Sequence, residues 1–184
     1  MKHFSILLAA LFFSLCGVSA PDLREEIEDY IKDKDARIGV AVIIDGVDTV
    51  SVNGDKAFPM LSVYKFPIAL ALGDYGRFGA KLLPDSVAIT SADLKADTYS
   101  PMRDKYGEID TINVALSELL AYSLQQSDNN ASDIILGLLP FVGYVNHYLS
   151  RCKIYGINVA NTEDEMHANP ALCYENASTP LAMA

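Results

Sequence analysis

The sequence predicts a fold of two parts, an α/β portion and a mostly helical, all-α portion. Three observations predict it: a β-rich hairpin in residues 38–52, helical periodicity through much of residues 62–178, and a length of 184 residues, about that of one domain. Residues 21–61 are therefore assigned to the α/β portion. Because two strands alone make a marginal sheet, further strands must extend the hairpin.

Residues 1–20 predict a secretory signal peptide. A short polar start precedes an apolar run from Phe4 to Cys16, and Val18-Ser19-Ala20 provides the small residues that a signal peptidase requires. The run is too short to be a membrane span. We therefore expect export to the periplasm, with a lipid anchor on Cys16 as the alternative.

The first structured segment is a helix from Pro21 to about Asp33, where apolar residues recur at helical spacing. A β-rich run follows from Ile38 to Ile44. The turn signal Asp45-Gly46 then leads into a return strand from Val47 to Val52. This order predicts one helix followed by one β-hairpin.

Successive helices are expected from Ser62 onward, interrupted by a mixed, turn-rich stretch in residues 84–110. Glycines at 73 and 76 are expected to end the first helix, and Pro140 the third. The expected helices are Val63 to Leu72, Thr111 to Gln126, Ala131 to Leu139 and Phe141 to Leu149.

Residues 155–178 show no clear period and predict a long loop, which carries the acidic run Glu163-Asp164-Glu165. Ser178-Thr179-Pro180 then has the chemistry of a helix start. The four residues that follow are too few to propagate a helix. We therefore expect residues 179–184 to be a truncated helix start in a fragment of a longer protein.

Composition narrows the class of protein. A content of 51% hydrophobic and 21% charged residues fits a packed globular chain. The formal net charge of −10 argues against nucleic-acid and anionic membrane partners, because phosphate contacts need Lys or Arg. Three cysteines and three histidines exclude a disulfide-rich scaffold or a zinc ribbon. In an oxidising compartment Cys152 and Cys173 either pair or remain two small buried residues.

Ser62 and Lys65 stand three residues apart, so both side chains share one face of the predicted helix. At a helix N-terminus, free N–H groups and the helix dipole favour the negative charge that develops in acyl transfer. A desolvated lysine beside a serine can act as a base. The alternative is that Ser62 only caps a helix. The same spacing at Ser150 and Lys153 is interpreted as coincidence.

Two further segments carry suitable polar groups. In Ser127-Asp128-Asn129 the hydroxyl can relay a proton and the amide can bind a carbonyl, while Asp128 braces the turn; an ordinary capped turn is the alternative. In the acidic segment the candidates are Glu163 and His167. The alternatives there are a solvated loop and a half-buried, hydrogen-bonding histidine.

Together these residues resemble the motifs of class A serine β-lactamases in order and approximate spacing. The resemblance covers about residues 37–184, and its motifs are Phe58 to Lys65, Tyr99-Ser100-Pro101, Ser127-Asp128-Asn129 and Glu163. It implies the β-lactamase/transpeptidase-like fold and a cephalosporinase-like branch. It also implies a periplasmic monomer that acts on small-molecule β-lactams without metal or cofactor, without a nucleic-acid partner and without membrane attachment beyond export.

The resemblance also implies a role for each residue. The catalytic set is Ser62 as nucleophile, Lys65 as the group that assists its deprotonation, Ser127 as proton donor to the β-lactam nitrogen, and Glu163 as the base of deacylation. The substrate-binding set is Asn129 on the side-chain carbonyl, Tyr99 at the mouth of the site, and His167 near the hydrolytic water.

Two departures from the family pattern matter. Glu165 with Asn169 is a second register for the acidic pair: the family's usual Asn favours it, whereas the offset from Ser127 favours Glu163. No Lys-Thr-Gly or Lys-Ser-Gly occurs in these residues. In the family that strand motif binds the substrate carboxylate, so we expect the 184 residues alone to be inactive and the C-terminal sheet strands to be missing.

Three other functions are also compatible with the sequence. A penicillin-binding transpeptidase or carboxypeptidase uses the same serine and lysine residues but lacks the loop glutamate. A serine glutaminase is a further candidate, but its reaction would leave the acidic loop without a clear role. A non-catalytic, exported β-lactam-sensing module would bind without acylation of Ser62.

Overall fold

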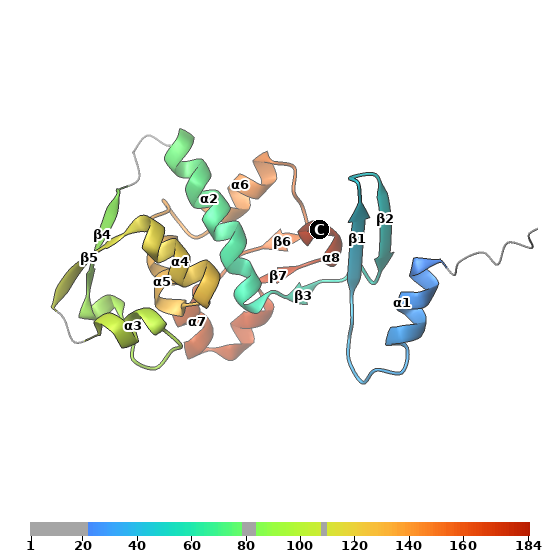
Figure 1. Cartoon of the computed structure of the whole chain (residues 1–184), viewed down its shortest axis with the longest axis horizontal. Helices are drawn as coiled ribbons and strands as arrows, with labels where there is room; N and C mark the ends of the chain where they lie inside the picture. Colours follow the sequence, from blue (N-terminus) through green and yellow to red (C-terminus); the bar gives the residue numbers. More distant parts are fainter. Residues whose placement is uncertain (1–21, 79–83, 108–109) are drawn as a thin grey trace, which may run out of the picture.

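The computed structural model describes residues 22–78, 84–107 and 110–184. Its elements form three groups along the longest axis: a hairpin with one helix, a small central sheet, and a helical body (Figure 1). The predicted signal peptide, residues 1–20, lies outside the described residues. Within the part of the chain that is described, no helix is long and apolar enough to cross a membrane.

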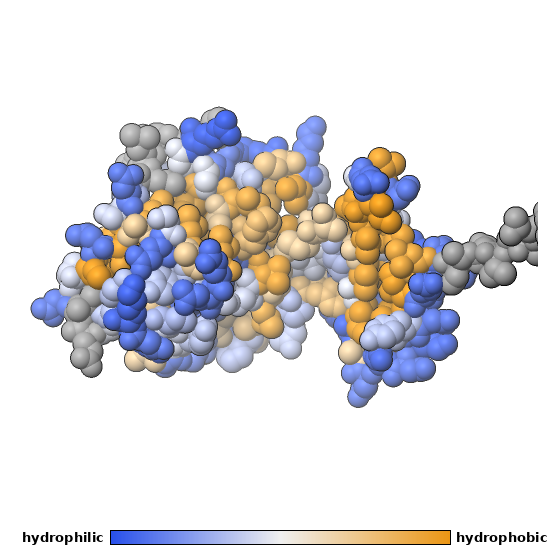
Figure 2. All heavy atoms as spheres, in the orientation of Figure 1, coloured by the Kyte–Doolittle hydropathy of each residue, from blue (hydrophilic) through white to orange (hydrophobic). Residues whose placement is uncertain are grey.

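The N-terminal group is the predicted helix and hairpin. Helix α1 (Leu23–Ile31) packs on strand β2 (Asp48–Val52), which pairs antiparallel with β1 (Val40–Ile44). The turn residues Asp45 and Gly46 have φ of 52° and 70°, the left-handed conformation that this dipeptide favours. The prediction of this hairpin is therefore confirmed. Hydrophobic side chains gather over it in Figure 2.

The central sheet joins segments that lie far apart in the sequence. Strand β7 (Ala177–Ser178) pairs antiparallel with both β3 (Phe58–Pro59) and β6 (Ile157–Asn158). Helix α8 (Pro180–Met183), capped by Thr179, follows β7 and packs against β1. The sheet therefore brings the segment before Ser62 next to the end of the acidic segment.

The first long helix extends beyond its predicted end. A 3₁₀ turn, η1 (Leu61–Tyr64), leads into α2 (Lys65–Phe78), which continues through Gly73 and Gly76. The prediction that these glycines end the helix is wrong. A glycine inside a helix costs only about 1 kcal/mol relative to alanine, and the burial of Ile68 and Leu72 in the core outweighs it.

The second predicted helix begins five residues late. Residues Thr111–Ala115 form strand β5, which pairs antiparallel with β4 (Ser86–Thr90), and helix α4 (Leu116–Gln126) follows. In β5 the more buried residues alternate, with Val114 buried. The portion predicted to be all-α therefore contains its own two-stranded sheet, because a partner strand is available in the turn-rich stretch.

Helices α2, α4, α5 and α6 pack around one hydrophobic core. Helix α5 (Asn129–Gly137) begins two residues before its predicted start, and α6 (Tyr144–Arg151) begins three after, so both predictions are confirmed with shifted ends. Helix α3 (Pro101–Tyr106) follows the short 3₁₀ turn η2 (Ser91–Asp93). Fully buried core residues include Tyr64, Ile68, Leu72, Met102, Leu119, Ile135 and Val145.

The segment predicted as a long loop is largely ordered secondary structure. It holds β6, helix α7 (Glu163–Ala168), the 3₁₀ turn η3 (Pro170–Tyr174) and β7. The prediction of a loop is wrong here. The missed signal is a capping box, in which the Thr162 hydroxyl accepts from the N–H of Glu165 and the Glu165 carboxylate accepts from the N–H of Thr162.

Candidate active site

The ammonium of Lys65 is the centre of the site. It donates to Ser62 Oγ at 3.4 Å, Ser127 Oγ at 3.3 Å and Asn129 Oδ1 at 2.7 Å. It also donates to the Ser127 carbonyl at 2.8 Å and forms an ion pair with Glu163 Oε1 at 3.2 Å. The Lys65 side chain is only 2% exposed. Four side chains from three regions of the sequence thus converge on one buried amine.

Local backbone geometry presents Ser62 to this amine. Ser62 lies in η1, and Lys65 is the first residue of α2, with its N–H on the carbonyls of Ser62 and Val63. Leu61, directly before Ser62, has φ of 45°, a conformation that costs an ordinary residue about 1–2 kcal/mol. Such strained backbone is concentrated at functional sites.

Asp128 holds the turn that carries Ser127 and Asn129. Ser127 ends α4 in the left-handed conformation, with φ of 56°. The fully buried Asp128 carboxylate accepts hydrogen bonds from the Ser100 hydroxyl and from the N–H groups of Met102 and Ala131, at 2.7–3.0 Å. The predicted bracing role of Asp128 is confirmed, and the braced turn directs Ser127 and Asn129 toward Lys65.

Asn129 bridges Lys65 and the segment before α3. Its amide nitrogen donates to Thr98 Oγ1 at 2.8 Å, and its main-chain N–H donates to the Tyr99 carbonyl at 3.1 Å. The Tyr99 residue is 62% exposed. Tyr99 therefore borders the cluster through its backbone, while its ring lies at the surface.

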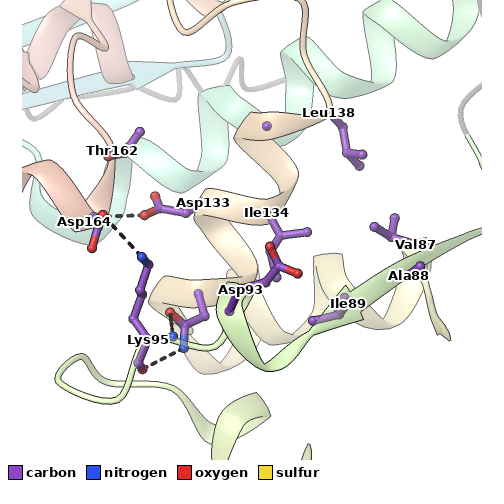
Figure 3. A pocket seen from close by; sticks show the side chains of 13 residues that line it. Val87, Ala88, Ile89, Asp93, Lys95, Asp133, Ile134, Leu138, Thr162 and Asp164 are labelled. Atoms are coloured by element: carbon purple, nitrogen blue, oxygen red, sulfur yellow. Dashed lines mark hydrogen bonds and ion pairs between the residues drawn. The ribbon is translucent and has the colours of Figure 1, made fainter. Parts of the chain in front are cut away.

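Glu163 enters the site from the first turn of α7, with a side chain that is 15% exposed. Its backbone is held by Asp133 of α5, whose carboxylate accepts from the N–H of Glu163 at 2.8 Å and from the N–H of Asp164 at 2.9 Å. Figure 3 shows Asp133 directed at Asp164, beside a cavity of about 490 Å³ that Lys95 also lines. Asp133 was not predicted, because nothing in the sequence pairs it with a segment 30 residues away.

Burial raises the pKa of the Asp133 carboxyl from 3.8 to about 6. The two backbone N–H groups act in the opposite direction and lower it, while the negative charges of Glu163 and Asp164 raise it further. The largest effect is the loss of water around the carboxylate. The group that anchors Glu163 therefore titrates close to neutral pH.

Two other candidates of the acidic segment do not reach Lys65. Glu165 closes the capping box with Thr162, whose N–H it accepts at 2.9 Å. His167 Nε2 lies 3.0 Å from Asp97 Oδ2, and the His167 side chain is 48% exposed. The structure thus places Glu163, rather than Glu165, beside Lys65. It does not bring His167 into the cluster, so the role expected for His167 near a hydrolytic water has no support in this geometry.

A cavity of about 570 Å³ opens in front of the cluster, a size suited to a small organic ligand. Four polar residues form one side of it, Ser62, Lys65, Ser123 and Ser127, and four apolar residues complete the lining, Val63, Phe66, Leu124 and Met183. Among the described residues, no three His, Cys, Asp or Glu side chains are placed to hold a metal ion. Cys152 is exposed, Cys173 is half-buried and both are free thiols, so the structure shows neither the pair nor the two buried residues expected from the sequence.

Known proteins resemble the chain over most of its length. The family model described as "Beta-lactamase enzyme family" matches residues 22–184. A β-lactamase of Bacteroides uniformis is 36% identical over 187 residues, covering 100% of the chain and 63% of that relative. The β-lactamase VEB-1 of Pseudomonas aeruginosa is 34% identical, covering 100% of the chain and 62% of that relative.

Solved structures agree with the sequence relatives. A representative class A β-lactamase from Bacteroides cellulosilyticus DSM 14838 superposes with a TM-score of 0.78 at 38% identity, covering 86% of the chain and 56% of that structure. The TLA-1 extended-spectrum β-lactamase superposes with a TM-score of 0.78 at 33% identity, covering 86% of the chain and 58% of that structure. The chain thus spans about three fifths of the length of these relatives. The predicted β-lactamase/transpeptidase-like fold is confirmed.

Proposed function

Because the chain belongs to the class A branch of the β-lactamase enzyme family, we propose that the full-length protein hydrolyses the β-lactam amide of penicillins and cephalosporins. One observation carries the proposal. The Lys65 ammonium lies within 3.4 Å of Ser62 Oγ, Ser127 Oγ and Glu163 Oε1 at once. A hydroxyl nucleophile, a proton relay and a carboxylate base are the groups that a serine acyl-enzyme mechanism requires.

In the proposed acylation step, Ser62 is the nucleophile and Ser127 is the proton donor. Ser62 Oγ attacks the β-lactam carbonyl carbon, and a C–O ester bond forms as the ring C–N bond breaks. The proton lost by Ser62 passes through a water to the Glu163 carboxylate, or directly to the Lys65 nitrogen when that amine is neutral. The Ser127 hydroxyl, held at 3.3 Å from Lys65, delivers a proton to the leaving nitrogen. Asn129, adjacent to the relay, binds the side-chain carbonyl of the substrate.

Deacylation uses Glu163. Its carboxylate removes a proton from a water molecule, whose oxygen attacks the ester carbonyl of the acyl-enzyme. The C–O bond to Ser62 breaks, and the serine oxygen recovers a proton. A penicillin-binding transpeptidase lacks this glutamate and keeps its acyl group until another nucleophile arrives. The position of Glu163 beside Lys65 therefore favours the hydrolase over the transpeptidase.

Cephalosporins are the first substrates to test. The sequence leans to a cephalosporinase-like branch, and one relative, the PER-1 enzyme of Pseudomonas aeruginosa at 30% identity, is named an extended-spectrum β-lactamase. The apolar side of the cavity suits the organic side chains of such antibiotics. Turnover of them would confer β-lactam resistance on the cell that makes the protein.

The test is turnover of a chromogenic cephalosporin by the purified full-length protein, followed by mass spectrometry of Ser62. Rapid turnover is expected. Ser62→Ala should abolish acylation, and Glu163→Gln should trap the acyl-enzyme. The matched control is Ser150→Ala, which alters the second serine that precedes a lysine by three residues. A long-lived adduct on the unaltered protein would indicate a transpeptidase, and binding without acylation a sensor module.

The cellular setting is also part of the proposal. We propose export to the periplasm, because residues 1–20 have the pattern of a cleaved signal peptide, and a monomer, as the resemblance to class A β-lactamases implies. Cell fractionation and N-terminal sequencing of the mature protein test export and the cleavage site. Analytical ultracentrifugation tests the monomer. Recovery in the membrane fraction with a modified Cys16 would support a lipid anchor instead.

A further inference from the structure

Tyr64 is a buried polar residue that the mechanism above does not use. It lies between Ser62 and Lys65 in η1, and its side chain is 0% exposed. Its hydroxyl has no hydrogen-bond partner among the described residues. Because buried hydroxyls are nearly always hydrogen-bonded, this group requires an acceptor, reached either directly or through an ordered water.

The neighbours of the hydroxyl indicate which acceptor it uses. Burial raises the pKa of the Tyr64 phenol strongly, the negative charges of Glu163 and Asp133 raise it further, and a side-chain interaction with Glu163 adds to the effect, so the Glu163 carboxylate lies close to the hydroxyl although no hydrogen bond of full geometry joins them. The phenol therefore stays protonated and can act as a donor. Both Asp133 oxygens already accept backbone N–H groups. The ion pair of Glu163 with Lys65 uses Oε1, and a carboxylate accepts at both oxygens.

We propose that Tyr64 is a positioning residue whose hydroxyl donates a hydrogen bond to the Glu163 carboxylate, directly or through one bound water. This contact complements the two that already restrain Glu163: Asp133 on its backbone and Lys65 on Oε1. It fixes the direction in which Glu163 accepts a proton. The inference rests on the proposed function, in which Glu163 activates the water of deacylation, and it predicts that loss of the Tyr64 hydroxyl slows deacylation more than acylation.

The test is Tyr64→Phe in the full-length protein, because phenylalanine keeps the buried ring and removes only the hydroxyl. Deacylation is expected to fall about tenfold, the effect of losing one charge-assisted hydrogen bond. The acylation rate, reported by kcat/KM, should stay within about twofold of the unaltered protein, because the Ser62 proton has a second route through Lys65 that does not use Glu163. The acyl-enzyme should therefore accumulate during turnover, as mass spectrometry would show.

Tyr106→Phe is the matched control. It also removes a phenol that donates to a carboxylate, that of Glu118 at 2.9 Å, but in a different part of the helical body. In the Tyr106→Phe variant the ratio of the acylation rate to the deacylation rate should not change. Equal losses in both steps for Tyr64→Phe, with a lower thermal midpoint, would mean a merely structural role and would overturn the proposal, as would an unchanged deacylation rate.

A high-resolution crystal structure of the full-length protein tests the contact between Tyr64 and Glu163 independently of any measurement of activity. The Tyr64 oxygen is expected within hydrogen-bond distance of a Glu163 carboxylate oxygen, or of one water that bridges the two. A hydroxyl directed to Asp133 or to a main-chain carbonyl would refute the inference. Should the unaltered protein never acylate Ser62, the proposed function fails, while this readout still decides the contact.

Discussion

Replacing Asp133 with asparagine should change how the stability of the protein depends on pH. In the folded protein the pKa of Asp133 is raised from 3.8 to about 6, mainly by burial. The folded state therefore holds the proton more tightly than the unfolded chain does. Stability from this group is fully present below pH 3.8 and is lost as the pH rises through about 6. Asparagine does not titrate, so Asp133→Asn removes this dependence.

The size of the effect follows from the two pKa values. A change from 3.8 to about 6 corresponds to about 3 kcal/mol, since a tenfold change in proton affinity is worth about 1.4 kcal/mol. Because the unfolded carboxyl is already more than half ionised at pH 4, the free energy of unfolding of the unaltered protein should fall by about 2 kcal/mol of this total, relative to Asp133→Asn, between pH 4 and pH 7. Glu163 and Asp164 on α7 and Tyr64 on η1 are the titratable groups close to Asp133, and Lys95 and Asp93 line the same cavity.

Urea unfolding of both proteins at half-unit steps from pH 4 to pH 7.5 measures this difference. Subtracting the variant's free energy from that of the unaltered protein cancels the titration of most other groups. Asp164→Asn is the control, because it neutralises an exposed neighbouring carboxylate and leaves Asp133 to titrate. A difference that stays flat with pH, or that increases as the pH rises, would refute the argument that burial dominates at this carboxylate.

Three further outcomes are expected. Gly73→Ala should raise the free energy of unfolding by about 0.5–1 kcal/mol in urea, because Gly73 lies inside α2 and an added Cβ meets no atom within 4 Å; a loss would mean that the helix is not continuous there. Asn176→Ala should lower the free energy of unfolding by about 3 kcal/mol, because the buried Asn176 amide accepts hydrogen bonds from the N–H groups of Ala160 and Asn161 and donates one to the Asn161 carbonyl. A loss under about 1 kcal/mol would contradict this expectation. Lys65→Met should reduce kcat/KM for a cephalosporin by roughly 10²–10⁴-fold with cooperative unfolding retained; near-normal turnover would exclude Lys65 from catalysis.

Several elements were predictable because their causes lie within a few residues of each other. Asp45-Gly46 specifies the hairpin turn by its own backbone preference. One helical turn separates Ser62 from Lys65, so their proximity follows from spacing alone. The capping box of Thr162 and Glu165 is an equally local signal, and it would have predicted helix α7 in place of a loop.

Local sequence signals were thus sufficient to predict the hairpin, most of the helices and the pairing of Ser62 with Lys65. The choice of Glu163 over Glu165 as the partner of Lys65 required the folded chain, because it depends on how Asp133 anchors α7 from another helix. Likewise, strand β5 exists because β4 lies beside it, and α2 continues through its glycines because it packs in the core. Backbone turns and helix spacing are set by neighbouring residues, whereas strand pairing, burial and the direction of a carboxylate depend on segments that only the folded chain brings together.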